Sequence, residues 1–334
     1  MTIKKLKKWT LITSVCLFAA APLYATTLKL SHVRPEGATI DVDVRHFADD
    51  VAKATNNKIK IQVYPASALG DYTLVQQRVG LGAVDMAVQP PSSSVDKRFQ
   101  IVYLPYLVNN WAEAKKVFAP NSPLRNTVSQ LYAKQGIKVL AGWPVYFGGI
   151  SLNKYVANAA DPNVKKGIKL RVPPVKAFQL TADDIGYIGS PLPFSEAFTA
   201  VQTGVVDGVM GSGAEGYYAS FRDVTKYYLP LNTHFEMWYL IINQETFDDL
   251  NKQEQNALMT AAAKFESARW ESAEADQKRN EQLLVKAGAT ILPVTDQQIE
   301  ETSKIVRQKV WPVVIKDMGA KWADGVLDKA IGTH

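Results

Sequence analysis

Short apolar runs alternate with segments of helical spacing along the first half of the chain. Four of these runs are rich in β-branched residues and are typical of buried strands: residues 27–33, 58–64, 84–88 and 137–141. Between them, residues 41–55 and 72–81 carry apolar side chains at the spacing of a helix face. Strands that alternate with helices in this way predict an α/β fold with a largely parallel sheet.

The second half repeats this alternation. The pattern predicts one helix and three further strands, at residues 175–185 and at residues 168–172, 187–190 and 205–210. Ser195 is expected to cap the next helix, with Glu196 in its first turn, where negative charge is favoured. Gly82 and Gly204 each stand where a helix ends before a strand. This echo fits two lobes of similar construction, although a chance repeat would also produce it.

Helical spacing dominates the last quarter of the chain. Asn251 with Glu254 has the pattern of a capping box, and Thr295 with Gln298 marks a further helix start. The run from residue 252 to about residue 285 contains no Pro or Gly and would reach about 50 Å at 1.5 Å per residue. A helix of that length could brace two lobes. The chain has no low-complexity linker, so we expect strand crossings to join them.

The first 25 residues have the pattern of a cleaved secretory signal. Four lysines precede an apolar run at residues 9–21, and Ala25 offers a small residue for cleavage. The run is shorter than the roughly 20 residues of a membrane span, so a membrane anchor is the weaker interpretation. Cys16, the only cysteine, leaves with this segment, and Val15 before it fits a lipoprotein site poorly. We therefore expect the mature chain in the periplasm.

Charge and motifs limit the function further. The chain has 38 basic and 32 acidic residues, but removal of the signal with its four lysines leaves a net charge of +2. Nucleic-acid binding thereby loses its main support. There is no G-x-S-x-G elbow and no P-loop, and the four histidines include no metal-binding pair on one helix face. His32 and His234 fit a structural hydrogen-bonding role first. We predict no enzyme activity, no cofactor and no metal-ligating residues, and the sequence leaves open whether a metal ion joins the site.

Arg171 is the clearest candidate for a binding residue. It lies near the end of the apolar strand predicted at residues 168–172. Ligands of open α/β sheets bind beyond the carboxyl ends of strands. Arginine grips a carboxylate through two parallel hydrogen bonds. The residue pattern alone fits an exposed surface arginine equally well.

A set of motifs runs in order along almost the whole mature chain: Phe47-Ala48 with Val51, residues 61–65, Leu69-Gly70-Asp71, residues 82–85, Leu104-Pro105-Tyr106, residues 136–140, residues 167–173, His234 and Asn243. The most specific is PFSEAFTAVQTGVVDG at residues 193–208. In these motifs the chain resembles the extracytoplasmic solute receptors of tripartite ATP-independent periplasmic (TRAP) transporters, of the dicarboxylate-receptor (DctP) type.

The resemblance implies a fold and a function. The fold would be α/β and two-lobed, like other periplasmic binding proteins, with crossing hinge strands and a long bracing helix. One lobe would comprise residues 26–147 and about 232–278, and the other about 148–231 and 279–334. The function would be to close around an organic acid and to deliver it to a membrane permease. A periplasmic enzyme on a similar scaffold is the competing class.

The resemblance also implies ligand-binding residues. Arg171 matches the family arginine that pairs with the ligand carboxylate, and Phe194 matches an aromatic residue of the pocket. Further pocket positions fall on Tyr72, on Gln89 with Pro90, and on His32 with Val33.

Two departures from the family pattern bear on the ligand. Many members have a second arginine where this chain has Gly148, and many have Glu-Asn or Gln-Asn where it has Val209-Met210-Gly211. We therefore expect one cation in the pocket, with Met210 and other contacts drawn from Trp143, Tyr146, Phe147, Glu215, Tyr217, Tyr218, Glu236 and Trp238. This favours a monocarboxylate with an apolar or aromatic body. An organic sulfonate, or a receptor that serves a sensor, is the alternative.

Overall fold

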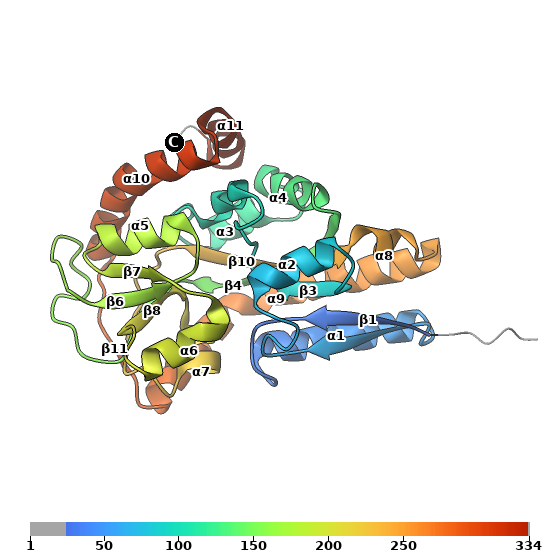
Figure 1. The fold of residues 1–334 in the computed structure, drawn as a ribbon, viewed down its shortest axis with the longest axis horizontal. Coiled ribbons are helices and arrows are strands. Elements are labelled where there is room, and N and C mark those ends of the chain that lie inside the picture. Colours follow the sequence, from blue (N-terminus) through green and yellow to red (C-terminus); the bar gives the residue numbers. More distant parts are fainter. Residues whose placement is uncertain (1–24, 333–334) are drawn as a thin grey trace, which may run out of the picture.

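The structure is a computed structural model that describes residues 25–332, so the predicted signal lies almost wholly outside the described residues. Two sheets form two lobes (Figure 1). In lobe I the strand order is β2 (Ile59–Tyr64), β1 (Thr26–Ser31), β3 (Met86–Gln89), β10 (Phe235–Asn243) and β4 (Ile137–Phe147). In lobe II it is β11 (Thr290–Ile291), β9 (Tyr227–Leu229), β5 (Gly149–Leu152), β8 (Gly208–Ser212), β6 (Lys169–Val172) and β7 (Ile188–Pro191).

Both sheets are mixed. The strand pairs β1–β2, β1–β3, β6–β7, β6–β8 and β9–β11 are parallel. However, β10 runs antiparallel to β3 and β4, and β5 runs antiparallel to β8 and β9. The predicted parallel pairing is therefore present in five of the nine strand pairs that the described residues form, and the other four are antiparallel. The cause is that β4 leads directly into β5 and β9 into β10, so these strands pass between the lobes without the crossover helix that parallel neighbours need.

Helices pack around both sheets (Figure 1). Lobe I carries α1 (Thr39–Ala54), α2 (Tyr72–Gly80), the 3-10 helix η1 (Lys97–Tyr103), α3 (Trp111–Phe118), α4 (Pro123–Ala133) and α8 (Gln244–Asp248). Lobe II carries α5 (Lys176–Asp184), α6 (Phe194–Gln202) and α7 (Ala214–Phe221). The chain ends in α9 (Lys252–Lys286), α10 (Asp296–Met318) and α11 (Ala320–Ile331). No helix among residues 25–332 combines the length and apolar character that crossing a membrane requires.

Most of the predicted helix starts are present. Both predicted capping boxes form, at the starts of α9 and α10. Ser195, however, does not cap α6, because the helix begins one residue earlier and Pro193 takes the N-cap position. The backbone N–H of Ser195 instead donates to Asp71 Oδ2 at 3.1 Å. Glu196 lies in the first turn as predicted.

Three segments connect the lobes. Only Gly148 separates β4 from β5, and it exchanges two backbone hydrogen bonds with residues 233 and 234 of the returning chain. The long helix α9 packs on β4 and α1 of lobe I and on α7 and β11 of lobe II. At the end of the chain, α10 contacts α5 and η1, and α11 contacts α4. The predicted crossing strands and bracing helix are therefore both present.

Candidate functional site

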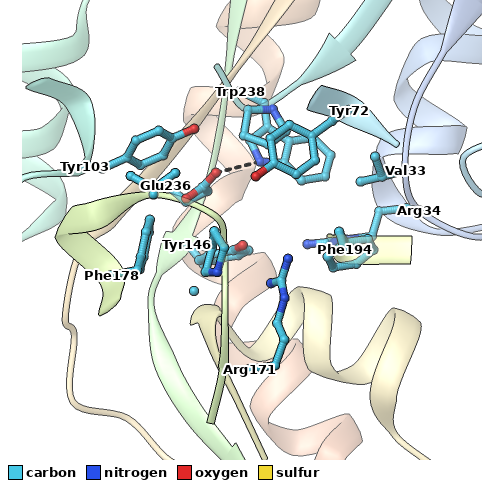
Figure 2. A pocket seen from close by; sticks show the side chains of 14 residues that line it. Val33, Arg34, Tyr72, Tyr103, Tyr146, Arg171, Phe178, Phe194, Glu236 and Trp238 are labelled. Atoms are coloured by element: carbon cyan, nitrogen blue, oxygen red, sulfur yellow. Dashed lines mark hydrogen bonds between the residues drawn. The ribbon is translucent and has the colours of Figure 1, made fainter. Parts of the chain in front are cut away.

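A small cavity lies where the two lobes meet. Its walls come from the loop after β1, from α2, η1, β4 and β10 of lobe I, and from β6, α5 and α6 of lobe II. Its free volume in this conformation is about 30 Å³, room for about two water molecules. A larger solute fits only if the walls move apart. Figure 2 labels ten of the lining residues: Val33, Arg34, Tyr72, Tyr103, Tyr146, Arg171, Phe178, Phe194, Glu236 and Trp238.

Arg171 points into this cavity from β6 (Figure 2). Its Nε donates to the carbonyl oxygen of Leu192 at 2.9 Å, which fixes the plane of the guanidinium. Its Nη2 is buried and has no hydrogen-bond partner. Burial lowers the pKa of Arg171 from its usual value, against the opposing effect of Tyr72 and Asp71. A buried cation with an unused donor is a costly arrangement unless a ligand completes it.

Arg34 brings a second guanidinium to the wall, from the loop that follows β1. It is fully paired with Glu215 of α7: Nε lies 3.0 Å and Nη2 2.9 Å from Glu215 Oε2. Both side chains are buried. Burial opposes the charge of Arg34, but Glu215 and Tyr146 together outweigh it and raise the pKa of Arg34. This ion pair joins lobe I to lobe II.

Glu236 supplies a negative charge to the same cavity, from β10. Its Oε1 accepts a hydrogen bond from Trp238 Nε1 at 2.9 Å. Its Oε2 lies 3.2 Å from His234 Nε2, although that nitrogen makes no hydrogen bond. Among residues 25–332, no group of three or more His, Cys, Asp or Glu side chains is placed to hold a metal ion.

Aromatic rings enclose the charged groups. The guanidinium carbons of Arg34 and Arg171 lie 5.1 and 5.7 Å from the ring centroid of Phe194, within cation–π range. Arg34 also lies 4.8 Å from the Trp238 ring. Burial raises the pKa of Tyr146, so its hydroxyl stays protonated at neutral pH. The cavity therefore combines charged hydrogen-bond donors with apolar walls, as small-ligand sites commonly do.

Asp71 links the two lobes at the rim. Its Oδ1 accepts from Thr73 N and so caps α2 of lobe I. Its Oδ2 accepts from Ser195 N in the first turn of α6 in lobe II. One carboxylate thus lies between the positive N-terminal ends of two helices, where negative charge is favoured.

Eight of the sixteen candidate contacts line the cavity: Arg171, Phe194, Tyr72, Tyr146, Glu236, Trp238, Val33 and Pro90. Trp143, Tyr217 and Tyr218 do not line it. Trp143 Nε1 donates to Asp43 Oδ2, the Tyr217 hydroxyl lies 2.8 Å from the carbonyl oxygens of Gly149 and Val209, and Tyr218 lies beside Arg222. Five more candidates are not among the lining residues: His32, Gln89, Phe147, Met210 and Glu215. The expectation that these five face the pocket is corrected by the contacts that they make elsewhere.

Each of these five has a structural partner. His32 Nε2 lies 3.1 Å from Asp41 Oδ1, and burial lowers the pKa of His32. Gln89 Nε2 donates to the backbone oxygen of Tyr72 at 2.8 Å, which positions that cavity residue from behind. Phe147 packs against Trp111 and Phe235, while Met210 is buried in the core and Glu215 pairs with Arg34.

The expectation of one pocket cation is wrong, because Arg34 was not predicted. At Gly148, where the family resemblance led us to expect an arginine, a Cβ atom would come within 2.0 Å of His234 Cε1. The glycine therefore makes room for the imidazole ring that lies beside Glu236. The second cation of this pocket comes from a different segment, directly after β1.

Sequence reasoning missed a glycine motif: Gly211, Gly213 and Gly216 have the spacing G-x-G-x-x-G where β8 leads into α7. In dinucleotide-binding proteins this spacing lets a phosphate approach. Here a Cβ on Gly213 would lie 2.5 Å from Tyr146, and one on Gly216 would lie 2.5 Å from Arg34 Nη2. Side chains of the cavity therefore fill the space that a phosphate would need.

Comparisons with known proteins agree with this fold and site. The family model of bacterial extracellular solute-binding protein, family 7 (DctP), matches residues 30–317. A solute-binding protein of Albidiferax ferrireducens is 30% identical over 325 residues, which cover 93% of this chain and 92% of that protein.

Two solved structures are similar along their whole length. An extracytoplasmic solute receptor of Bordetella pertussis that binds pyroglutamic acid is 26% identical, with a TM-score of 0.81 over 92% of this chain and 99% of its own. A TRAP periplasmic solute-binding protein of Haemophilus influenzae with bound L-gulonate is 27% identical, with a TM-score of 0.80 over 91% and 98%. The chain therefore belongs to the DctP family of bacterial extracellular solute-binding proteins, which are TRAP-type receptors for small organic acids and not enzymes.

Proposed function

We propose that this receptor binds an organic acid with a single carboxylate, which lies on Arg171, and with an apolar or ring-shaped body between the aromatic walls. The observation that carries the proposal is the free Nη2 of Arg171, a buried charged donor at the wall of an interlobe cavity. A carboxylate oxygen supplies the missing acceptor and the missing counter-charge. Charge-assisted hydrogen bonds of this kind are among the strong ones in proteins.

The charges around Arg171 favour one negative group on the solute. Glu215 already neutralises Arg34 through two close contacts, so Arg34 has little positive charge to offer. Glu236 adds a negative charge to the wall. A second carboxylate on the solute would therefore enter a closed cavity without a free cation, and an unpaired buried charge costs several kcal/mol. Pyroglutamic acid and L-gulonate, which the two similar receptors bind, each carry one carboxyl group.

We also propose that the receptor delivers this acid to the permease subunits of a TRAP transporter. Family membership over residues 30–317 and a cavity lined by residues of both lobes support this role. Closure selects the liganded state, because a solute contacts both lobes only when they are together.

Calorimetry with size-matched acids tests the ligand class. We expect butanoate to bind at least about tenfold more tightly than succinate, and pentanoate more tightly than glutarate, which corresponds to about 1.4 kcal/mol. Tighter binding of the dicarboxylate in both pairs would refute the monocarboxylate. Tighter binding of the matching alkanesulfonate would move the class from carboxylates to sulfonates.

We propose a periplasmic location after cleavage behind Ala25, on the basis of the lysine-rich start and the short apolar run. Sequencing of the N-terminus of protein from the periplasmic fraction is expected to begin at Thr26 or within a few residues of it. Recovery of an intact Met1 on the soluble, ligand-binding receptor would contradict this expectation.

A further inference from the structure

We infer that Glu236 forms the second end of the binding site, so that the solute carries an N–H donor, either an ammonium or an amide, as well as its carboxylate. This inference rests on the proposed function, in which Arg171 holds the carboxylate. The two residues come from different lobes, Arg171 from β6 and Glu236 from β10. In Figure 2 the guanidinium and the carboxylate point into the cavity from different sides.

Glu236 keeps hydrogen-bonding capacity that its neighbours leave unused. Its side chain is 5% exposed. A carboxylate offers about four acceptor positions, and Trp238 Nε1 occupies one of them. The approach of His234 Nε2 to 3.2 Å lacks hydrogen-bond geometry. The hydroxyl of Tyr103 is directed elsewhere, because it donates to the carbonyl oxygen of Pro91 at 2.7 Å.

The cations of the cavity do not neutralise Glu236. Within residues 25–332 its only ion-pair contact is His234, and neither guanidinium of the cavity pairs with it. Arg34 is held by Glu215, and the side-chain hydrogen bond of Arg171 goes to a backbone oxygen. The cavity thus presents one free positive group and one partly satisfied negative group.

A solute with both a carboxylate and an N–H donor matches both groups at once. Its carboxylate would pair with Arg171, and its N–H would donate to Glu236. A zwitterion would leave the closed cavity electrically balanced and would avoid the free-energy cost of an unpaired buried charge. A hydrocarbon ring would leave the Glu236 acceptors unpaired, and buried groups without partners discriminate strongly against such analogues.

Ring acids of one size test this on the unmodified receptor. The set is piperidine-4-carboxylate, tetrahydropyran-4-carboxylate, 4-hydroxycyclohexanecarboxylate and cyclohexanecarboxylate. A second set places the donor next to the carboxylate: proline, pyroglutamate, tetrahydrofuran-2-carboxylate and cyclopentanecarboxylate. In at least one set, calorimetry should show the N–H acids binding at least tenfold more tightly than their donor-free rings.

Replacement of Glu236 locates the effect. Glu236→Gln keeps the side-chain volume but removes the charge, so we expect at least a tenfold loss for the preferred N–H acid and less than a threefold change for the matched donor-free ring. The control is Glu271→Gln on the exposed face of α9, which should leave both affinities unchanged. If Glu236→Gln does not fold, the wild-type ring series decides alone.

The outcomes separate this inference from the proposed function. Equal affinity for N–H acids and donor-free rings, with both bound in an Arg171-dependent way, would overturn the role of Glu236 and leave the proposed function intact. Equal affinity for the hydroxyl ring and the piperidine ring would overturn the assignment to nitrogen. If no organic acid binds at all, the proposed function fails and the inference fails with it.

Discussion

Arg171→Lys is expected to weaken solute binding about 100-fold. Arg171 Nε donates a hydrogen bond to the carbonyl oxygen of Leu192, which fixes the plane of the guanidinium. Nη2 of the same planar group has no partner and is available to the ligand. Lysine has one nitrogen and cannot reproduce this fork. Hydrogen bonds to charged groups contribute roughly 1.5–3 kcal/mol, and each 1.4 kcal/mol is about tenfold in affinity. Titration calorimetry of the tightest-binding acid measures the loss.

A matched control separates this effect from a general loss of charge. Arg222 lies on the surface at the end of α7 in the same lobe, and its side chain bonds only to nearby backbone oxygens. Arg222→Lys is expected to bind as the wild type does. An Arg171→Lys receptor that melts normally and retains wild-type affinity would refute the role given to Arg171.

Glu215→Met is expected to hold the receptor open. The carboxylate is the buried partner of Arg34 across the lobe interface, and removal of one member of such a pair costs about 3–5 kcal/mol if the other stays buried. Lobe opening lets water reach Arg34, so the cost should appear as opening and not as unfolding. We expect affinity to fall at least 100-fold. Small-angle scattering should show a larger radius of gyration at a solute concentration that closes the wild type.

The double variant Arg34→Met/Glu215→Met tests whether the unpaired charge of Arg34 is what opposes closure. With both charges gone, closure buries no unpaired ion, and replacement of a buried pair by apolar side chains is often neutral. With solute present, we expect the scattering profile of the double variant to be close to that of the closed wild type. If the single variant closes as the wild type does, or if the double variant stays open, the pair does not control closure.

Local patterns predicted much of the fold because they act over a few residues. The capping boxes of α9 and α10 and the short strands of the first lobe all follow from such patterns. The nine-residue strand β10 was not predicted, since every residue of it is buried and no alternation marks a face. The predicted strand at residues 137–141 stopped too early. Pro144 argues against a central strand, but β4 lies at the edge of its sheet, where a proline is tolerated, and it continues through Pro144.

The site was less predictable, because its charges pair over long distances in the sequence. Arg171 was accessible to prediction, as it stands at a strand end and matches a family position. The partner of Arg34 is 181 residues away, and nothing near Arg34 indicates it. Glu236 was only one of several candidates. The room that Gly148 leaves for His234 beside Glu236 can be seen only in the folded chain.

The shared carboxylate of Asp71 has a consequence for the rate of loading. It joins the N-terminal ends of α2 and α6 only while the lobes are together, and so adds to closure whether or not solute is present. In this conformation the free volume of about 30 Å³ is smaller than an organic acid, so a solute must meet a receptor whose lobes have moved apart. The observed association rate constant is then the intrinsic rate constant multiplied by the open fraction. Asp71 stabilises the closed state and lowers the open fraction, and it slows solute capture by the same factor.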